Sequence, residues 1–125
     1  MSAVRYTKDH EWILMEGDEI GVIGITDYAQ DQLGELVYVE LPELDQVLAA
    51  GSDAVVIESV KAAGEVRAPV NGTVTEVNDT LVDEPGKVNS DPVGEGWFFK
   101  MRVSNTGELD DLMDEDAYTE FTDGL

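Results

Sequence analysis

The chain has 125 residues, of which 42% are hydrophobic and 28% are charged, a composition typical of a single water-soluble domain. It carries 28 acidic residues against 7 basic ones, for a formal net charge of -21, so we expect it to repel nucleic acid. It contains no cysteine, which excludes disulfides, thiolate metal sites and thiol catalysis.

Membrane and secretory segments are also absent from the sequence pattern. No apolar run approaches the roughly 18 residues that span a bilayer, and the start of the chain lacks the apolar stretch of a secretory signal. We therefore expect one domain over residues 1–125, located in the cytoplasm and without membrane contact.

The acidic excess favours a halophilic host. The electrostatic screening length is roughly 8 Å at physiological salt but about 3 Å at 1 M. A surface with this many acidic groups therefore repels itself far less in brine. An acidic surface that binds partner proteins, or a merely acidic carrier, is the alternative explanation.

The first part of the chain predicts a β-hairpin, a short helix and a strand. Residues 10–15 and 19–25 are apolar-rich runs separated by a turn sequence. Thr26 then provides a helix N-cap, and Gly34 stands where a helix ends in a left-handed residue. Residues 36–39 are rich in β-forming side chains and predict the next strand.

Further strands are expected over residues 54–58, 65–68, 74–77 and 97–103. Residues 59–63 read as the turn between the first two of these strands. Asn71-Gly72 is a strong signal for a second hairpin, joining strands 65–68 and 74–77.

The end of the chain predicts a helical segment over about 106–122. Leu109, Leu112 and Met113 recur at helical spacing, and acidic residues in the first turn suit the helix dipole. Tyr118 and Phe121 extend this apolar face, so we expect them to dock the tail onto the sheet.

The chain offers few parts for catalysis. His10 is the only histidine, and an enzyme would have to rest on His10 with Glu11 and no third group. Phosphate-binding loops, nucleophile elbows and calcium loops are missing. We therefore expect no catalytic residue and no metal site.

Lys61 is the most distinctive side chain. It is one of four lysines, and it lies at the tip of a predicted hairpin between the small or apolar residues Val60 and Ala62. Another protein can contact such a side chain from either side. An amine becomes a good nucleophile only when a modifying enzyme desolvates or deprotonates it. The alternative is a solvated surface lysine.

Motifs along the whole chain resemble, in order, the H proteins of the glycine cleavage system. They are His10-Glu11-Trp12, Gly24-Ile25-Thr26-Asp27, Leu33-Gly34, Val39-Glu40-Leu41-Pro42, Glu58-Ser59-Val60-Lys61-Ala62, Glu76-Val77-Asn78, Asn89-Ser90, Gly96-Trp97 and Tyr118. The resemblance implies a mainly β fold: a flattened, lipoyl-domain-like barrel-sandwich hybrid with one short internal helix and a helical C-terminus.

The resemblance also implies a carrier protein instead of an enzyme. Lipoate would be attached covalently to Lys61 by a lipoate-attaching enzyme. The lipoyl group would carry an aminomethyl group from glycine decarboxylase, a pyridoxal phosphate enzyme, to the tetrahydrofolate-dependent aminomethyltransferase. The FAD enzyme dihydrolipoamide dehydrogenase would then reoxidise it.

Four further residues match family positions. Glu58, three residues before Lys61, and Gly72, eleven after it, match positions that the lipoate-attaching enzyme recognises. Glu11 and Glu65 match acidic positions that help to dock the loaded arm in a surface cleft, where a carboxylate suits a protonated amine.

Several carriers share this architecture. Biotin carriers resemble Met-Lys-Met at the modified tip, so Val60 and Ala62 argue against biotin. A lipoyl domain of a 2-oxoacid dehydrogenase, a relay that passes lipoate to other enzymes, and an unmodified interaction module of the same fold remain open.

Overall fold

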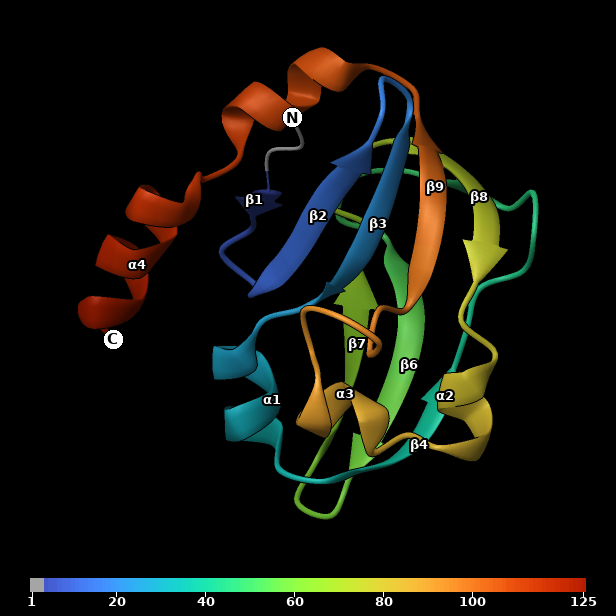
Figure 1. The fold of residues 1–125 in the computed structure, drawn as a ribbon, viewed down its shortest axis with the longest axis vertical. Coiled ribbons are helices and arrows are strands. Elements are labelled where there is room, and N and C mark those ends of the chain that lie inside the picture. The colour runs from blue at the N-terminus through green and yellow to red at the C-terminus, as the bar shows by residue number, and fades with distance from the viewer. Residues whose placement is uncertain (1–3) are drawn as a thin grey trace.

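The computed structural model describes residues 4–125, so the first three residues of the expected 1–125 domain lie outside it. Two antiparallel β-sheets dominate the fold (Figure 1). The larger sheet contains, in spatial order, β1 (Val4–Tyr6), β2 (Glu11–Glu16), β3 (Ile20–Ile25), β9 (Phe99–Val103), β8 (Gly72–Val77) and β5 (Val47–Leu48). The smaller sheet contains β4 (Leu36–Glu40), β6 (Asp53–Ser59) and β7 (Ala63–Arg67). The mainly β expectation is confirmed.

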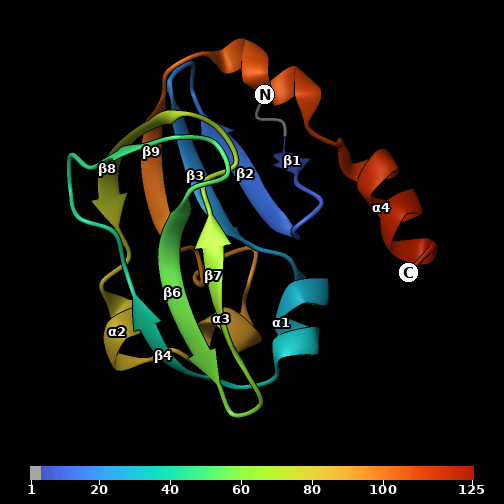
Figure 2. The ribbon, with the colours of Figure 1, turned by 180° about the vertical axis from the view of Figure 1, so that it is seen from behind.

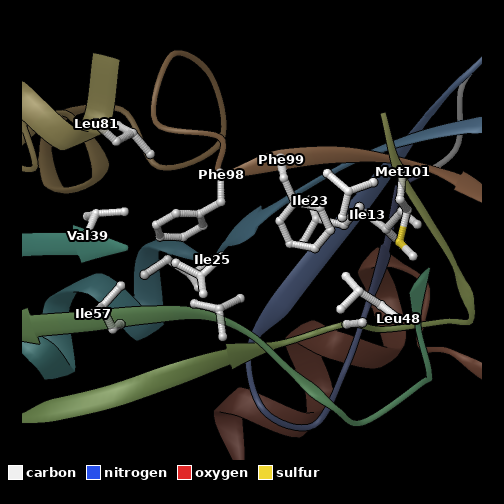
Figure 3. Packing of buried hydrophobic residues seen from close by; sticks show 14 of the residues in the cluster. Ile13, Ile23, Ile25, Val39, Leu48, Ile57, Leu81, Phe98, Phe99 and Met101 are labelled. Carbon is white, nitrogen blue, oxygen red and sulfur yellow. The ribbon is translucent and has the colours of Figure 1, made fainter. Parts of the chain in front are cut away.

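The core lies between the two sheets. Inward-pointing side chains from both sheets form one buried cluster, which includes Ile13 and Phe99 of the larger sheet and Ile57 of the smaller one (Figure 3). Burying a large aliphatic or aromatic side chain contributes about 1.5–3 kcal/mol. The largest fully buried side chains are Phe98, Phe99, Ile13, Ile23, Leu81, Met101, Val55, Val66, Val70, Val74 and Val88. This packing makes a rigid base for the edges and loops of the sheets.

Short helices surround the two sheets. They are α1 (Asp27–Leu33), α2 (Thr80–Asp83), α3 (Lys87–Ser90), the 3-10 helix η1 (Thr106–Asp111) and α4 (Glu115–Asp123). The helices α1, α2 and α3 lie at one end of the molecule, and α4 lies beside β1 (Figure 1). Both predicted signals of α1 are confirmed. Thr26 Oγ1 accepts a hydrogen bond from Ala29 N at 3.2 Å, and Gly34 follows the helix with φ 79°. Among the described residues, none of the helices has the length and apolar composition needed to cross a bilayer.

The predicted hairpin at Asn71-Gly72 is wrong. β7 pairs with β6 in the smaller sheet, whereas β8 pairs with β5 and β9 in the larger one, so the chain crosses between sheets here. Ala68 and Val70 are buried in the core during the crossing. The Asn71 side chain forms hydrogen bonds to residues distant in sequence: its Oδ1 accepts from Ala50 N at 2.9 Å, and its Nδ2 donates to Glu108 at 2.7 Å.

The predicted helical tail is interrupted. Between η1 and α4, Met113 pairs with Tyr6 of β1 through two backbone hydrogen bonds of 2.8 and 3.0 Å. The expected docking onto the sheet is confirmed for Tyr118, which is buried and stacks on Tyr6 of β1 with ring centroids 4.4 Å apart. Its ring centroid also lies 6.4 Å from that of Phe121. The tail is therefore held by side chains on α4 and by a strand-like pairing before it.

Candidate functional site

Lys61 lies at the tip of the hairpin formed by β6 and β7, at the end of the molecule where α1 and α3 also lie (Figures 1 and 2). Ser59 closes the turn. Its backbone N donates to Ala62 O at 2.7 Å, and its hydroxyl accepts from the backbone N of Lys61 at 3.2 Å and of Ala62 at 3.0 Å. These bonds satisfy the turn internally, so the tip is a defined structure.

The Lys61 side chain is exposed and lies over Gly34. A Cβ built on Gly34 would be 2.9 Å from Lys61 Cε and 3.6 Å from its Nζ. Within residues 4–125, Lys61 makes no ion pair, whereas Lys87 contacts Glu95 at 3.4 Å and Lys100 contacts Glu16 at 3.1 Å. The amine of Lys61 is therefore open to a modifying enzyme.

A cleft of about 220 Å³ begins just beyond the hairpin tip, between β7 and α1. Its lining residues are Asp9, His10, Glu11, Ile25, Ala29, Gln32, Leu33, Ile57, Gly64, Glu65 and Val66. Glu65 follows Lys61 by four residues and is the third residue of β7, so even a fully extended backbone would separate the two by no more than about 13 Å. A long arm on Lys61 can thus lie along β7 and reach the cleft. Glu11 and Glu65 both line this cleft.

Glu11 and Glu65 occupy different environments in this cleft. Glu11 is 3% exposed, and its carboxylate accepts hydrogen bonds from Thr7 Oγ1 at 2.9 Å and from Arg67 N at 3.1 Å. The second bond links β2 to β7 across the two sheets. Burial raises the pKa of Glu11, and the two hydrogen bonds oppose this rise. Glu65 is exposed and therefore accessible to a bound group.

His10 forms part of the cleft wall, a position that no local sequence signal indicated. Its backbone has φ 69°, and its Nδ1 lies 2.7 Å from the hydroxyl of Tyr118, which is also 2.7 Å from Thr26 Oγ1. Its ring lies 4.5 Å from that of Tyr28. Burial lowers the pKa of His10. Tyr118 is 108 residues away in sequence, so only the tertiary fold makes this contact.

The two expected recognition residues are not together. Glu58 is exposed on β6 next to the hairpin tip, opposite Tyr38 and Ala63 in the sheet. Gly72 is buried on β8, in the other sheet. A Cβ at Gly72 would collide with the Arg102 carbonyl and lie 2.6 Å from Met101 Cε, so close strand packing explains this glycine.

Comparison with known proteins gives a consistent result. The family model for the glycine cleavage H-protein matches residues 4–124. Glycine cleavage system H proteins of Rhodospirillum rubrum and Xanthobacter autotrophicus are each 56% identical to this chain, covering 100% of it and 99% of each relative. The H protein of Thermotoga maritima is 52% identical, covering 97% of both chains.

A solved structure agrees with these relatives. The crystal structure of a glycine cleavage system H protein from Mycobacterium marinum superposes with a TM-score of 0.87 at 34% identity, covering 98% of each chain. The barrel-sandwich architecture expected from the motifs is confirmed. The chain therefore belongs to the glycine cleavage H-protein family.

Proposed function

We propose that this chain is the lipoyl carrier protein of a glycine cleavage system and that lipoate is joined to Lys61 Nζ in amide linkage. The observation that carries the proposal is the position of Lys61: exposed at a stiff hairpin tip, without an ion pair in residues 4–125, and beside a cleft. Family membership supports the same role. The chain would act as a substrate of the system's enzymes and not as a catalyst.

When bound, the lipoyl group supplies a redox-active disulfide for transfer of an aminomethyl unit from glycine decarboxylase to the aminomethyltransferase, with reoxidation by dihydrolipoamide dehydrogenase. The protein's own contribution is placement. The packed sheets keep Lys61 at a fixed point, so only the flexible arm has to travel between partners.

The cleft would shelter the arm between visits. Its walls include the apolar side chains of Ile25, Leu33 and Val66, which exclude water. Glu65 is exposed there and would pair with a protonated amine. Glu11 is buried and each of its carboxylate oxygens already accepts a hydrogen bond from the protein, so it would act by holding the cleft wall.

Attachment would use the exposed side of the hairpin. Glu58 lies close enough in the fold to Lys61 for one enzyme to contact both. Gly72 would contribute by keeping β8 packed against β9, since a buried residue offers no contact surface.

Intact-mass spectrometry of protein from the native host tests the proposal. We expect one lipoyl increment, lost in Lys61→Ala and kept in Lys8→Ala, which changes another exposed lysine. Unmodified protein from cells grown on glycine would refute the carrier role and favour an interaction module. Modified protein that fails to support carbon dioxide exchange with glycine decarboxylase would favour a lipoate relay.

We further propose that the carrier works in a salt-rich cytoplasm. The support is the net charge of -21, whose self-repulsion is weaker at high salt. The free energy of unfolding should fall markedly when potassium chloride is lowered from about 1 M to about 0.1 M, where the screening length rises from about 3 to 10 Å. Equal stability at both salt concentrations would contradict the halophilic reading.

A further inference from the structure

We propose that Asn89 is a positioning residue for Lys61. Asn89 lies on α3, and its side chain fixes residues 34–36, here called the seat segment, on which the lysine hairpin rests. The inference rests on the proposed function in one respect, because it treats Lys61 as the attachment point.

The hairpin touches the seat segment in two ways. Val60 N, adjacent to Lys61, donates a hydrogen bond to Glu35 O at 3.0 Å. The Lys61 side chain lies over Gly34, close enough that a Cβ there would approach Cε to 2.9 Å. The direction in which Lys61 leaves the hairpin therefore depends on where the seat segment lies.

Asn89 holds the seat segment on both sides of Glu35. Its Nδ2 donates to Gly34 O at 2.8 Å, and its Oδ1 accepts from Leu36 N at 2.9 Å. The second hydrogen of Nδ2 reaches Gln30 Oε1 on α1 at 3.0 Å. Both amide donors are thus used, and these partly buried bonds compete less with water than exposed ones.

The backbone alone holds this segment weakly. Gly34 has φ 79° and ψ -165°, so regular structure stops there. The pairing of β4 with β6 shifts register between Leu36 and Tyr38, which interrupts the ladder next to the seat segment. Asn89 supplies side-chain hydrogen bonds where the sheet supplies fewer backbone ones.

Asn78 provides a matched control. Its Nδ2 also donates to two backbone carbonyls, those of Glu95 and Trp97, each at 2.8 Å. None of these groups belongs to the hairpin or the seat segment. Removing either asparagine should lower global stability by a similar amount, but only the loss of Asn89 should speed hydrogen exchange of the Val60 amide.

Amide hydrogen exchange of the full chain, followed by NMR, tests the inference. In Asn89→Ala we expect the Val60 amide to exchange roughly fivefold faster than in wild type, as for loss of one net hydrogen bond. In Asn78→Ala, Val60 should keep its wild-type rate. The Ser59 amide, bonded within the turn to Ala62 O, should stay protected in both variants.

Asn89→Asp gives a second variant should Asn89→Ala fold poorly. It keeps an acceptor for Leu36 N but removes both donors, so Val60 should again exchange faster than in the Asn78 control. An unchanged Val60 rate in the Asn89 variants, or an equal increase in Asn78→Ala, would overturn the positioning role.

Attachment kinetics give an independent readout. The assay uses lipoate, ATP and a lipoate–protein ligase. We expect kcat/KM for modification to fall several-fold in Asn89→Ala and to stay near the wild-type value in Asn78→Ala. Equal values in the two variants would count against the positioning role. A wild-type chain that accepts no lipoate would refute the proposed function but leave the exchange result intact. Normal lipoylation with an unchanged Val60 rate would refute the positioning role alone.

Discussion

Gly34→Ala tests the contact beneath Lys61 directly. Gly34 has φ 79° and ψ -165°, a region that almost only glycine occupies, so alanine there should cost about 1–3 kcal/mol of stability. Its Cβ would also lie 2.9 Å from Lys61 Cε. Because that atom belongs to a flexible side chain, Lys61 can move aside, so the collision should displace the lysine without adding much to the loss.

The expected loss of stability in Gly34→Ala is large enough to measure by thermal and urea unfolding. For a chain of this length, 1 kcal/mol corresponds to roughly 4 °C in Tm, so Gly34→Ala should lower Tm by about 4–12 °C. Urea unfolding should give the same loss of free energy. Attachment of lipoate should also slow, because the amine has left its place over residue 34.

Gly64→Ala is the matched control on β7 of the same hairpin. A Cβ there meets no atom within 4 Å. Since glycine weakens a strand, this variant should be neutral or more stable by up to about 1 kcal/mol. If Gly34→Ala were as stable as Gly64→Ala and were modified equally fast, the reasoning about the lysine and its seat segment would be refuted.

Two further predictions concern the cleft wall. Tyr118→Phe removes the hydroxyl that contacts both His10 and Thr26, and it should lower the free energy of unfolding, measured in urea, by about 1–3 kcal/mol. An unchanged urea midpoint would show that the ring alone docks the tail. Burial raises the pKa of Glu11, so the folded protein binds this proton more tightly than the unfolded chain does. The stability gained from this protonation is fully present below about pH 4 and is lost as the pH rises through the raised folded pKa. Glu11→Gln lacks this titration, so its unfolding free energy relative to wild type should increase as the pH rises above about 4. A relative stability independent of pH would contradict the assignment.

Local signals were sufficient where the structure depends on neighbouring residues. Thr26 and Gly34 predicted both ends of α1 because capping requires only a side-chain oxygen and a residue that tolerates positive φ. Two apolar-rich runs separated by a turn sequence predicted the strands of the opening hairpin for the same reason.

Local signals failed where a bend has two possible outcomes. Asn71-Gly72 looks like a hairpin turn, yet the chain uses this point to pass from one sheet to the other. The choice depends on burial of Ala68 and Val70 in the shared core and on the side-chain bonds of Asn71, which involve distant residues. The break in the tail at Met113 likewise depends on pairing with Tyr6, more than a hundred residues earlier.

The sequence by itself determined the family, the mainly β composition and the exposed lysine, since these follow from ordered motifs, residue periodicity and the turn around Lys61. Only the tertiary structure decided what surrounds that lysine: the seat segment held by Asn89, and the cleft between β7 and α1. These features join residues far apart in the chain, and such contacts form only when the two sheets close on their common core.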